Sequence, residues 1–314
     1  MSMGGITGGL ARMVPLFQAI YDAALAHLCK QKHWHADETR WPVFIEIPEK
    51  VGHRWMLWLI QSKEAAVFVL DPTRAHDVPE KALGPDARGI MSVDRYSGYK
   101  AMIQVKEGKI ILSFCWSHAR RDFLDVGKSW PKEEPWAFEW LGRIGLLYKV
   151  NDERVAALKD PEVFAVKDKE VRQQVEELVK QRDKELQDKD IHPARKKVLS
   201  SQAEHWSGLT VFVDHPEVPM DNNTGERALR GPVVGRKNYR GSGARWAGEL
   251  AAMMFSVFGT LALWKINPRL WLTDYLQTCA RAGGKPPDDL TEFLPWTMSE
   301  QRKKELALVV SQKR

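Results

Sequence analysis

The chain has 314 residues, of which 44% are hydrophobic and 28% charged, so it can bury one large core or two ordinary ones, and an intrinsically disordered chain is excluded. Its formal net charge of +6 is a mild bias toward polyanionic partners and does not determine the fold. The three cysteines are far apart and the first residues lack a signal-peptide pattern, so we expect reduced thiols and a cytoplasmic protein.

The first part of the chain is predicted to contain a helix followed by three strands. Apolar residues at helical spacing predict a helix from Val14 to Lys30. Alternating apolar residues predict a strand from Trp41 to Ile47, with Asp37 just before or within it. Two further apolar runs, His53 to Ser62 and Ala65 to Asp71, follow after short polar connections. Consecutive strands with short connections usually pair, so we expect an antiparallel meander.

Two more strands follow, and short helical segments separate them. Pro79 to Leu83 is predicted as a helix, Gly89 to Asp94 as a fourth strand that ends on its aspartate, and Ile111 to Trp116 as a fifth strand. Another helix begins at Ser117. This order predicts an α/β fold with a mixed five-stranded sheet flanked by helices. It is similar to the order of the ribonuclease-H-like fold, whose members carry one carboxylate on the first strand, one at the end of the fourth and one on a later helix.

A charged helical insertion is predicted from Lys132 to Pro219. Its segment from Lys167 to Asp190 has valine and leucine on one face and charges of both signs elsewhere, which favours a helical hairpin or arm. A solvated spacer is the simpler interpretation, and an arm that contacts DNA or another subunit is the alternative.

The segment from Ala247 to Trp264 has the length of a short membrane-spanning helix and a single charge. Because Glu249, Ser256 and Thr260 make it unsuited to lipid, we expect the central helix of a core and no membrane partner. A further helix is predicted from Asn267 to Ala282.

The segment from Asp221 to Asn238 places one carboxylate, Glu226, beside several cations. Asn223 or Thr224 is a plausible N-cap, so that Glu226 lies in the first helical turn. Gly231-Pro232 is expected to end the helix after barely two turns. Taken alone, this segment also fits a capped surface helix with solvated charges.

Asp37, Asp94 and Glu226 occupy the three carboxylate positions of that fold. Phosphodiester cleavage and transfer use two divalent cations, one to activate the attacking oxygen and one to stabilise the leaving oxygen, with carboxylates between them. Carboxylate oxygens favour Mg²⁺ or Mn²⁺. We therefore predict that these three residues are catalytic and bind two Mg²⁺ or Mn²⁺ ions, with Asp37 as the bridging ligand.

Five sequence blocks occur in order along the chain. They are ADET (Ala36–Thr39), VDRYSGY (Val93–Tyr99), CWSHARRDF (Cys115–Phe123), DNNTGERALR (Asp221–Arg230) and GRKN (Gly235–Asn238). Together they resemble the signature blocks of the insertion sequence 66 family of bacterial transposases, although Arg95 stands where a glycine is commoner. The resemblance implies a DDE-type core with Asp37, Asp94 and Glu226 as its catalytic triad. It also implies transposon ends and target DNA as substrates and a homo-oligomer on DNA, with accessory proteins of the same element as further candidate partners.

These expectations divide the chain into four regions. Residues 1–131 would form the first part of a ribonuclease-H-like catalytic core, residues 132–219 the helical insertion, residues 220–265 the completion of the core, and residues 266–314 a C-terminal helical tail.

Basic side chains near the carboxylates predict where DNA binds. His118, Arg120 and Arg121 follow the fifth strand, where they could hold a phosphate. The segment from Gly235 to Gly243 combines glycines, cations and an aromatic, as in a loop that follows a nucleic-acid backbone. The predicted DNA-binding residues are His118, Arg120, Arg121, Arg227, Arg230, Arg236, Lys237, Asn238 and Arg240. A capped helix start and a plain surface loop are the alternatives.

Two other interpretations stay open. Cys115 and His118, with His33 and His35, could ligate zinc, although a structural zinc site needs four ligands in paired spacing and the sequence has one such pair. The chain also begins shortly before Asp37, where the family usually has a longer DNA-end-binding region. A non-catalytic DNA-binding or regulatory remnant of a transposase is therefore the alternative function.

Overall fold

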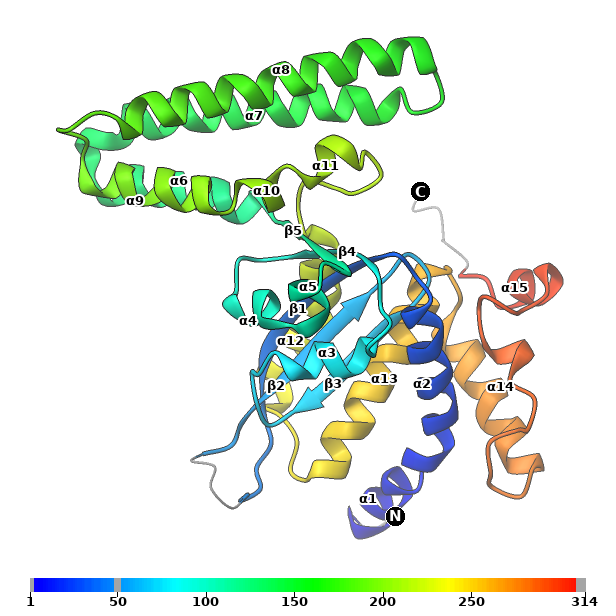
Figure 1. Ribbon diagram of the computed structural model, residues 1–314. Helices are drawn as coiled ribbons and strands as arrows, with labels where there is room; N and C mark the ends of the chain where they lie inside the picture. Colours follow the sequence, from blue (N-terminus) through cyan, green and yellow to red (C-terminus); the bar gives the residue numbers. More distant parts are fainter. Residues whose placement is uncertain (1–2, 48–51, 309–314) are drawn as a thin grey trace, which may run out of the picture. The chain divides into compact units, whose positions relative to one another are not determined.

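The strands of the sheet are paired in the order β3-β2-β1-β4-β5 (Figure 1). The computed structural model describes residues 3–47 and 52–308. Its strands are β1 (His33–Pro42), β2 (Arg54–Gln61), β3 (Ala66–Asp71), β4 (Gly89–Val93) and β5 (Ile110–Phe114). The fold is α/β, with a mixed five-stranded sheet and flanking helices, as the order of sequence elements predicts.

The chain folds into two compact units, and each unit combines segments that are separated in the sequence. The first contains Met1–Gly89, Gly98–Ile110 and Thr224–Arg314, and the second contains Ile90–Ser97 and Ile111–Asn223. The helices of the first unit are α1 (Met3–Ala11), α2 (Val14–Cys29), α3 (Asp77–Leu83), α4 (Ser97–Ala101), α5 (Ile103–Lys106), α12 (Asn223–Tyr239), α13 (Arg245–Leu263), α14 (Pro268–Arg281) and α15 (Glu300–Glu305), with a 3₁₀ turn at Thr291–Phe293. Those of the second unit are α6 (Trp116–Ser129), α7 (Glu134–Ala156), α8 (Pro161–Leu186), α9 (Pro193–Glu204), α10 (Trp206–Leu209) and α11 (Val211–Asp214), with a 3₁₀ turn at Pro131–Glu133.

The first three strands form the predicted antiparallel meander, but β1 has other bounds than predicted. It begins at His33 and ends at Pro42, so Asp37 lies in its interior. Pro42 has no N–H to donate to a ladder. Beyond it, Val43 forms an isolated bridge to Ser242, a residue of a distant segment. The strand predicted from Trp41 to Ile47 was therefore placed too late in the chain.

The outer edge of β3 is covered by side chains of α13 and α2. An edge strand would otherwise present unpaired backbone groups. Ser256 Oγ accepts a hydrogen bond from Phe68 N at 2.8 Å, and Thr260 Oγ1 accepts one from Ala66 N at 3.0 Å. The Tyr21 hydroxyl of α2 donates to Phe68 O at 3.0 Å. These bonds explain why an otherwise apolar helix carries two hydroxyl residues on its buried side.

One helix of the described residues, α13, is long and apolar enough to cross a membrane by length and composition alone. In the structure, Leu250, Met253 and Val257 of this helix are buried in a core cluster. A methyl group at Gly259 would lie only 3.1 Å from the Ala66 Cβ, so the helix packs closely on β3. These contacts are those of the core helix that the sequence predicts.

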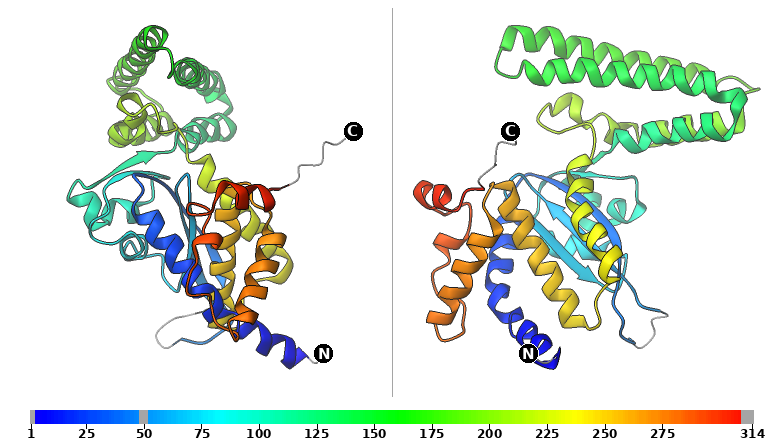
Figure 2. Two further views of the ribbon diagram at one scale, coloured as in Figure 1. Left: turned by 90° about the vertical axis from the view of Figure 1, so that its right-hand side faces the viewer. Right: turned by 180° about the vertical axis from the view of Figure 1, so that it is seen from behind.

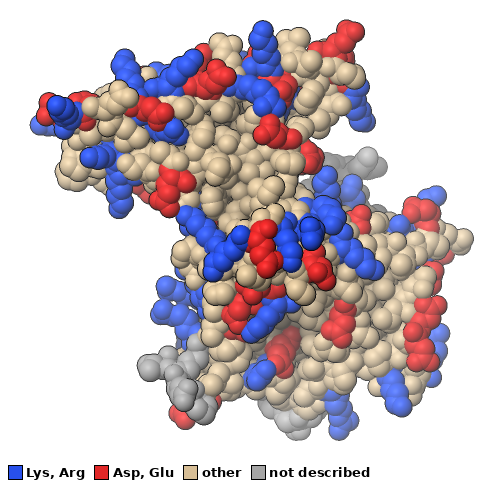
Figure 3. Space-filling view, viewed as in Figure 1, with Lys and Arg blue, Asp and Glu red and all other residues tan. Residues whose placement is uncertain are grey.

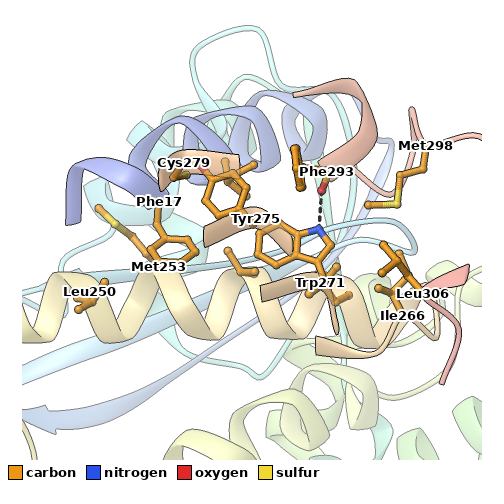
Figure 4. Close-up of a cluster of buried hydrophobic side chains, with 13 residues drawn as sticks. Phe17, Leu250, Met253, Ile266, Trp271, Tyr275, Cys279, Phe293, Met298 and Leu306 are labelled. Carbon is orange, nitrogen blue, oxygen red and sulfur yellow. Dashed lines mark hydrogen bonds between the residues drawn. The ribbon is translucent and has the colours of Figure 1, made fainter. Parts of the chain in front are cut away.

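α14 lies beside α2 and α13 (Figure 2). A large cluster of apolar side chains joins these three helices (Figure 4). Phe17, Met253, Trp271 and Tyr275 are all buried in it. Trp271 stacks on Tyr275 with ring centroids 5.0 Å apart, and its indole Nε1 donates to Phe293 O at 3.0 Å. Burial of side chains this large contributes on the order of 2–3 kcal/mol each. The helix predicted from Asn267 to Ala282 is therefore packed into the core of the first unit.

The second unit contains a long helical hairpin. α7 and α8 pack against each other and are joined by a short connection (Figure 1). The Asp160 side chain caps α8 by accepting a hydrogen bond from Val163 N at 3.2 Å. Acidic and basic side chains are interspersed over these helices (Figure 3). The predicted helical content of residues 132–219 is confirmed, whereas the predicted domain boundaries stay a prediction.

Arg154 is a fully buried cation that connects three helices of the second unit. Its guanidinium donates to Asp168 Oδ1 of α8 at 2.9 Å and to Asn151 Oδ1 of α7 at 2.8 Å. It also donates to the carbonyl oxygens of Phe212 and Val213 in α11, at 2.6 and 3.0 Å. Because these acceptors come from separate helices, one side chain holds α7, α8 and α11 together.

The substitution Arg154→Ala is expected to lower the free energy of unfolding by about 2–4 kcal/mol, because it removes the donor of the Phe212 carbonyl and of the Asn151 side-chain oxygen. Burial acts to raise the pKa of Asp168, but hydrogen bonds from Arg172 and Arg154 outweigh it and lower that pKa. The loss should therefore be full at neutral pH and shrink as the pH falls through the lowered pKa. Urea denaturation followed by circular dichroism measures it. Lys180→Ala, on the exposed side of α8, is the control. If it lowers the free energy of unfolding as much as Arg154→Ala does, Arg154 does not have the structural role proposed for it.

Candidate active site

Asp37 projects from β1 toward the sheet face that α12 and α13 cover. It stands directly opposite Leu59 of β2, and directly opposed residues share a face. Leu59 belongs to a buried cluster with Trp41 of β1 and Leu229 of α12. The half-buried Asp37 carboxylate accepts a hydrogen bond from Glu38 N at 2.8 Å. The interior of a strand thus fixes the position of this carboxylate.

Glu226 lies in the first turn of α12, as predicted. Leu229, three residues later, is buried against β1, β2 and α13, and residues three apart lie on neighbouring positions of a helix surface. The half-buried Glu226 is therefore carried by the helix that packs on the face to which Asp37 projects. A carboxylate in a first turn is also stabilised by the helix dipole. The first unit thus brings two of the three predicted carboxylates to one face of its sheet.

The helix does not end at Gly231-Pro232, which corrects the sequence prediction, because α12 continues to Tyr239. A proline inside a helix removes a hydrogen bond and costs about 3 kcal/mol. Tertiary contacts offset this cost. Pro232 is buried, and Arg236 Nη1 donates to Thr39 Oγ1 at 3.1 Å. Beyond them, Tyr239 packs on Trp41 with ring centroids 5.9 Å apart.

The predicted loop from Gly235 to Gly243 is also wrong in its first half, because Arg236, Lys237 and Asn238 are helical. The chain turns after the helix, where Arg240 has a left-handed φ of 65° and Gly241 a φ of 140°. A Cβ at Gly241 would lie 2.3 Å from Pro42 O, so only glycine fits there. The end of this segment is consequently held against β1.

Cations occupy the exposed side of α12. Arg227, Arg230 and Lys237 are exposed, as is Arg240 just after the helix, whereas Leu229 is buried. Within residues 3–47 and 52–308, none of these four cations forms an ion pair. The DNA-binding residues predicted in the first unit, which include the exposed Asn238, therefore lie on one helix and the turn that follows it.

Asp94 directly follows β4 in the second unit. Its Oδ1 accepts a hydrogen bond from Tyr96 N at 2.8 Å, an aspartate turn that orients the carboxylate. Arg95 donates to Ser201 Oγ of α9 at 3.0 Å and also bonds to Asp122 of α6. Arg95 thus ties this turn to two helices, a role that the sequence pattern does not reveal.

Residues at the start of α6 form hydrogen bonds with Asp221 and Asn222, which follow the helical insertion in the sequence. Cys115 Sγ accepts a hydrogen bond from Asn222 N at 3.2 Å. Ser117 Oγ and the Tyr148 hydroxyl both donate to Asp221 Oδ2 at 3.4 Å. Burial and the Asp221 carboxylate raise the pKa of Tyr148, so its phenol stays a donor. The sequence block that begins at Cys115 and the block that begins at Asp221 are therefore in direct contact within the second unit.

Three predicted DNA-binding residues lie on α6, where Arg120 and Arg121 are exposed and His118 is half-buried. Burial raises the pKa of Cys115, which disfavours the thiolate that a zinc ion would need. The convergence of Asp94, His118, Arg120 and Arg121 with the residues of the first unit stays a prediction.

Sequence reasoning missed the contacts of Glu38 and Thr39, the two residues that follow Asp37 on β1. Thr39 receives the Arg236 hydrogen bond, and Glu38 accepts hydrogen bonds from Arg74 and from the Tyr99 hydroxyl. The sequence carries no local signal for these contacts, because their partners Arg236, Arg74 and Tyr99 come from three other segments.

A model of the IS66 family of transposases matches residues 2–250 of this chain. Because this match covers most of the chain, the chain belongs to the IS66 transposase family.

Two uncharacterized proteins of Sinorhizobium fredii (strain NBRC 101917 / NGR234) are similar to it over most of its length. Protein y4hP is 26% identical over 303 residues, which cover 88% of this chain and 52% of y4hP. Protein y4jD is 27% identical over 304 residues, which cover 93% of this chain and 58% of y4jD. The chain therefore spans about half the length of the curated relatives that it matches.

His33, near the start of β1, makes a pH-dependent contribution to stability. Burial, followed by the nearby His35 and Lys63, lowers the pKa of His33 from 6.5 to about 4. As the pH falls below 6.5, the unfolded chain binds a proton that the folded chain does not bind until about pH 4. The free energy of unfolding is therefore expected to fall over this range, and His33→Leu should flatten that slope. Guanidinium denaturation followed by tryptophan fluorescence measures it. His33→Gln should reproduce the effect, and a slope equal to that of the unmodified chain in both variants would contradict the prediction.

Proposed function

We propose that the chain is the catalytic core of a DDE transposase with a ribonuclease-H-like fold, which cleaves DNA strands at the ends of an insertion sequence and joins them to target DNA. The observation that carries this proposal is the position of Asp37 and Glu226 on one face of the sheet in the first unit. Asp94, which follows β4 directly, is the third proposed catalytic residue. Assembly as a homo-oligomer on DNA, with accessory proteins of the same element, belongs to the same proposal.

Asp37, Asp94 and Glu226 are the proposed ligands of two divalent cations. Their oxygen atoms are hard donors that suit Mg²⁺ or Mn²⁺. Carboxylates that share one face repel each other, and a cation relieves that repulsion. When bound, such ions activate the attacking oxygen and stabilise the leaving oxygen of a phosphodiester.

The cations of α12 are proposed to hold the DNA backbone beside these carboxylates. Arg227, Arg230 and Lys237 are exposed and free of ion pairs in the described part of the chain, so they are available to phosphates. Guanidinium groups match phosphate geometry, and contacts to phosphates carry no direct sequence information. Arg120 and Arg121 of α6 are proposed to contribute in the same way from the second unit.

Glu226→Gln is expected to reduce manganese-dependent nicking of supercoiled DNA by roughly 10²- to 10³-fold, because the amide removes the charge that a cation needs. DNA affinity should stay nearly unchanged, since the residue is not a phosphate contact. Gel electrophoresis of plasmid topoisomers measures nicking, and filter binding measures affinity. Glu249→Gln, at a half-buried glutamate of α13, is the matched control. Unchanged cleavage by the Glu226→Gln protein would rule out the catalytic role and favour a non-catalytic DNA-binding protein.

Lys237→Ala combined with Arg240→Ala is expected to weaken binding to all duplexes alike. The slope of log affinity against log salt should fall by about 1 for each lost phosphate contact. Filter binding over a salt series gives both quantities. Arg269→Ala with Arg281→Ala, two exposed arginines of α14, removes the same charge from another helix and should leave the slope unchanged. Equal effects in the two double variants would mean that net charge alone, and not α12, governs binding.

A further inference from the structure

A pocket of about 660 Å³ lies in the first unit, next to the end of β1. Its lining residues come from β1, β2, the segment after β3, and α12; they are Glu38, Thr39, Arg40, Arg54, Met56, Pro72, Thr73, Arg74 and Arg236. We call it the arginine pocket, since four of these nine residues are arginines and one is acidic.

Strand register fixes two of the arginines on one face of the sheet. Arg40 of β1 stands opposite Met56 of β2, and Arg54 is two residues from Met56 on the same strand. Residues in this diagonal relation lie about 7–8 Å apart, within reach of long side chains. Both side chains are exposed, so their guanidinium groups can meet a ligand in the pocket.

The charges of the arginine pocket are only partly neutralised. Arg74 forms an ion pair with Glu38, whose carboxylate also accepts a hydrogen bond from the Tyr99 hydroxyl at 2.6 Å. Over the part of the chain that the structure describes, Arg40, Arg54 and Arg236 form no ion pair. Three cations that gather at one hollow repel one another and raise its affinity for anions. The pocket therefore carries the charge of a phosphate-binding site.

The arginine pocket is close to the candidate catalytic strand. Thr39, which accepts the Arg236 hydrogen bond, lines the pocket and lies two residues after Asp37 on β1. Two residues along a strand span about 7 Å. Thr39 shares with Asp37 the sheet face that α12 covers, whereas Arg40 and Arg54 lie on the opposite face. Since residues of both faces line the pocket, a DNA strand bound there would pass beside Asp37 at the side formed by Thr39 and Arg236.

We propose that the arginine pocket binds backbone phosphates of a DNA strand that flank the reacting phosphodiester. The proposal rests on the proposed function and deepens it, because it adds Arg40 and Arg54 to the DNA contacts and places them on the sheet. Guanidinium groups bind phosphates bidentately, which suits a contact that positions a strand.

Arg40→Ala combined with Arg54→Ala tests this proposal. Affinity for a short duplex of mixed sequence should fall roughly tenfold, and the salt slope should fall by about 2, because two phosphate contacts are lost. Fluorescence anisotropy over a salt series measures both. The control is again Arg269→Ala with Arg281→Ala, which should bind like the unmodified chain.

A second measurement on the unmodified chain avoids any effect of the substitutions on folding. Phenylglyoxal modifies accessible arginines, and mass spectrometry locates the modified sites. Duplex DNA should protect Arg40 and Arg54 from the reagent, whereas Arg269 on α14 should stay reactive. Modification of Arg40 and Arg54 that DNA does not reduce would overturn the proposal.

The outcomes separate this proposal from the proposed function. If the unmodified chain binds and nicks DNA while the Arg40→Ala, Arg54→Ala protein keeps its affinity and salt slope, the pocket proposal alone fails. If the unmodified chain neither binds nor nicks DNA, the proposed function fails and the pocket proposal fails with it.

Discussion

The packing of α12 on β1 and β2 is the constraint on which the candidate site depends. Leu229 is buried with Trp41 and Leu59 in one cluster. Glu226 lies three residues before Leu229, and Asp37 stands opposite Leu59. The apolar contacts that fix the helix on the sheet therefore also fix the two carboxylates. A site on such rigid elements keeps its geometry better than a site on loops.

The parts of the fold that follow from local patterns could be predicted from the sequence. β2, β3 and α13 are runs of apolar residues with clear ends, and both Asp37 and Glu226 were assigned to the correct kind of element. The end of β1 and the continuation of α12 past Pro232 could not be predicted. They depend on contacts such as that between Arg236 and Thr39, which lie 197 positions apart in the chain.

The role of polar residues inside an apolar helix also depends on contacts with distant segments, so it cannot be predicted from the sequence. Ser256 and Thr260 suggest from sequence alone only that α13 is unsuited to lipid. In the structure they bond to the backbone of Phe68 and Ala66, and so they complete the hydrogen bonding of an edge strand. An unpaired backbone group in this buried position would cost about 1–3 kcal/mol. The function of these hydroxyl groups depends on β3, a segment far away in the sequence.

The positions of the charged residues say more about where an anion can bind than the net charge does. Arg74, Arg95 and Arg154 are each bonded to a carboxylate, so they serve the structure of their own unit. The cations on the exposed side of α12 and three of those in the arginine pocket are not bonded in this way within the described residues. Both groups lie in the first unit, which also carries Asp37 and Glu226. Cations without an ion-pair partner are therefore concentrated in the unit that carries the two carboxylates, where they favour a polyanion, whereas the charge of the paired arginines is largely neutralised.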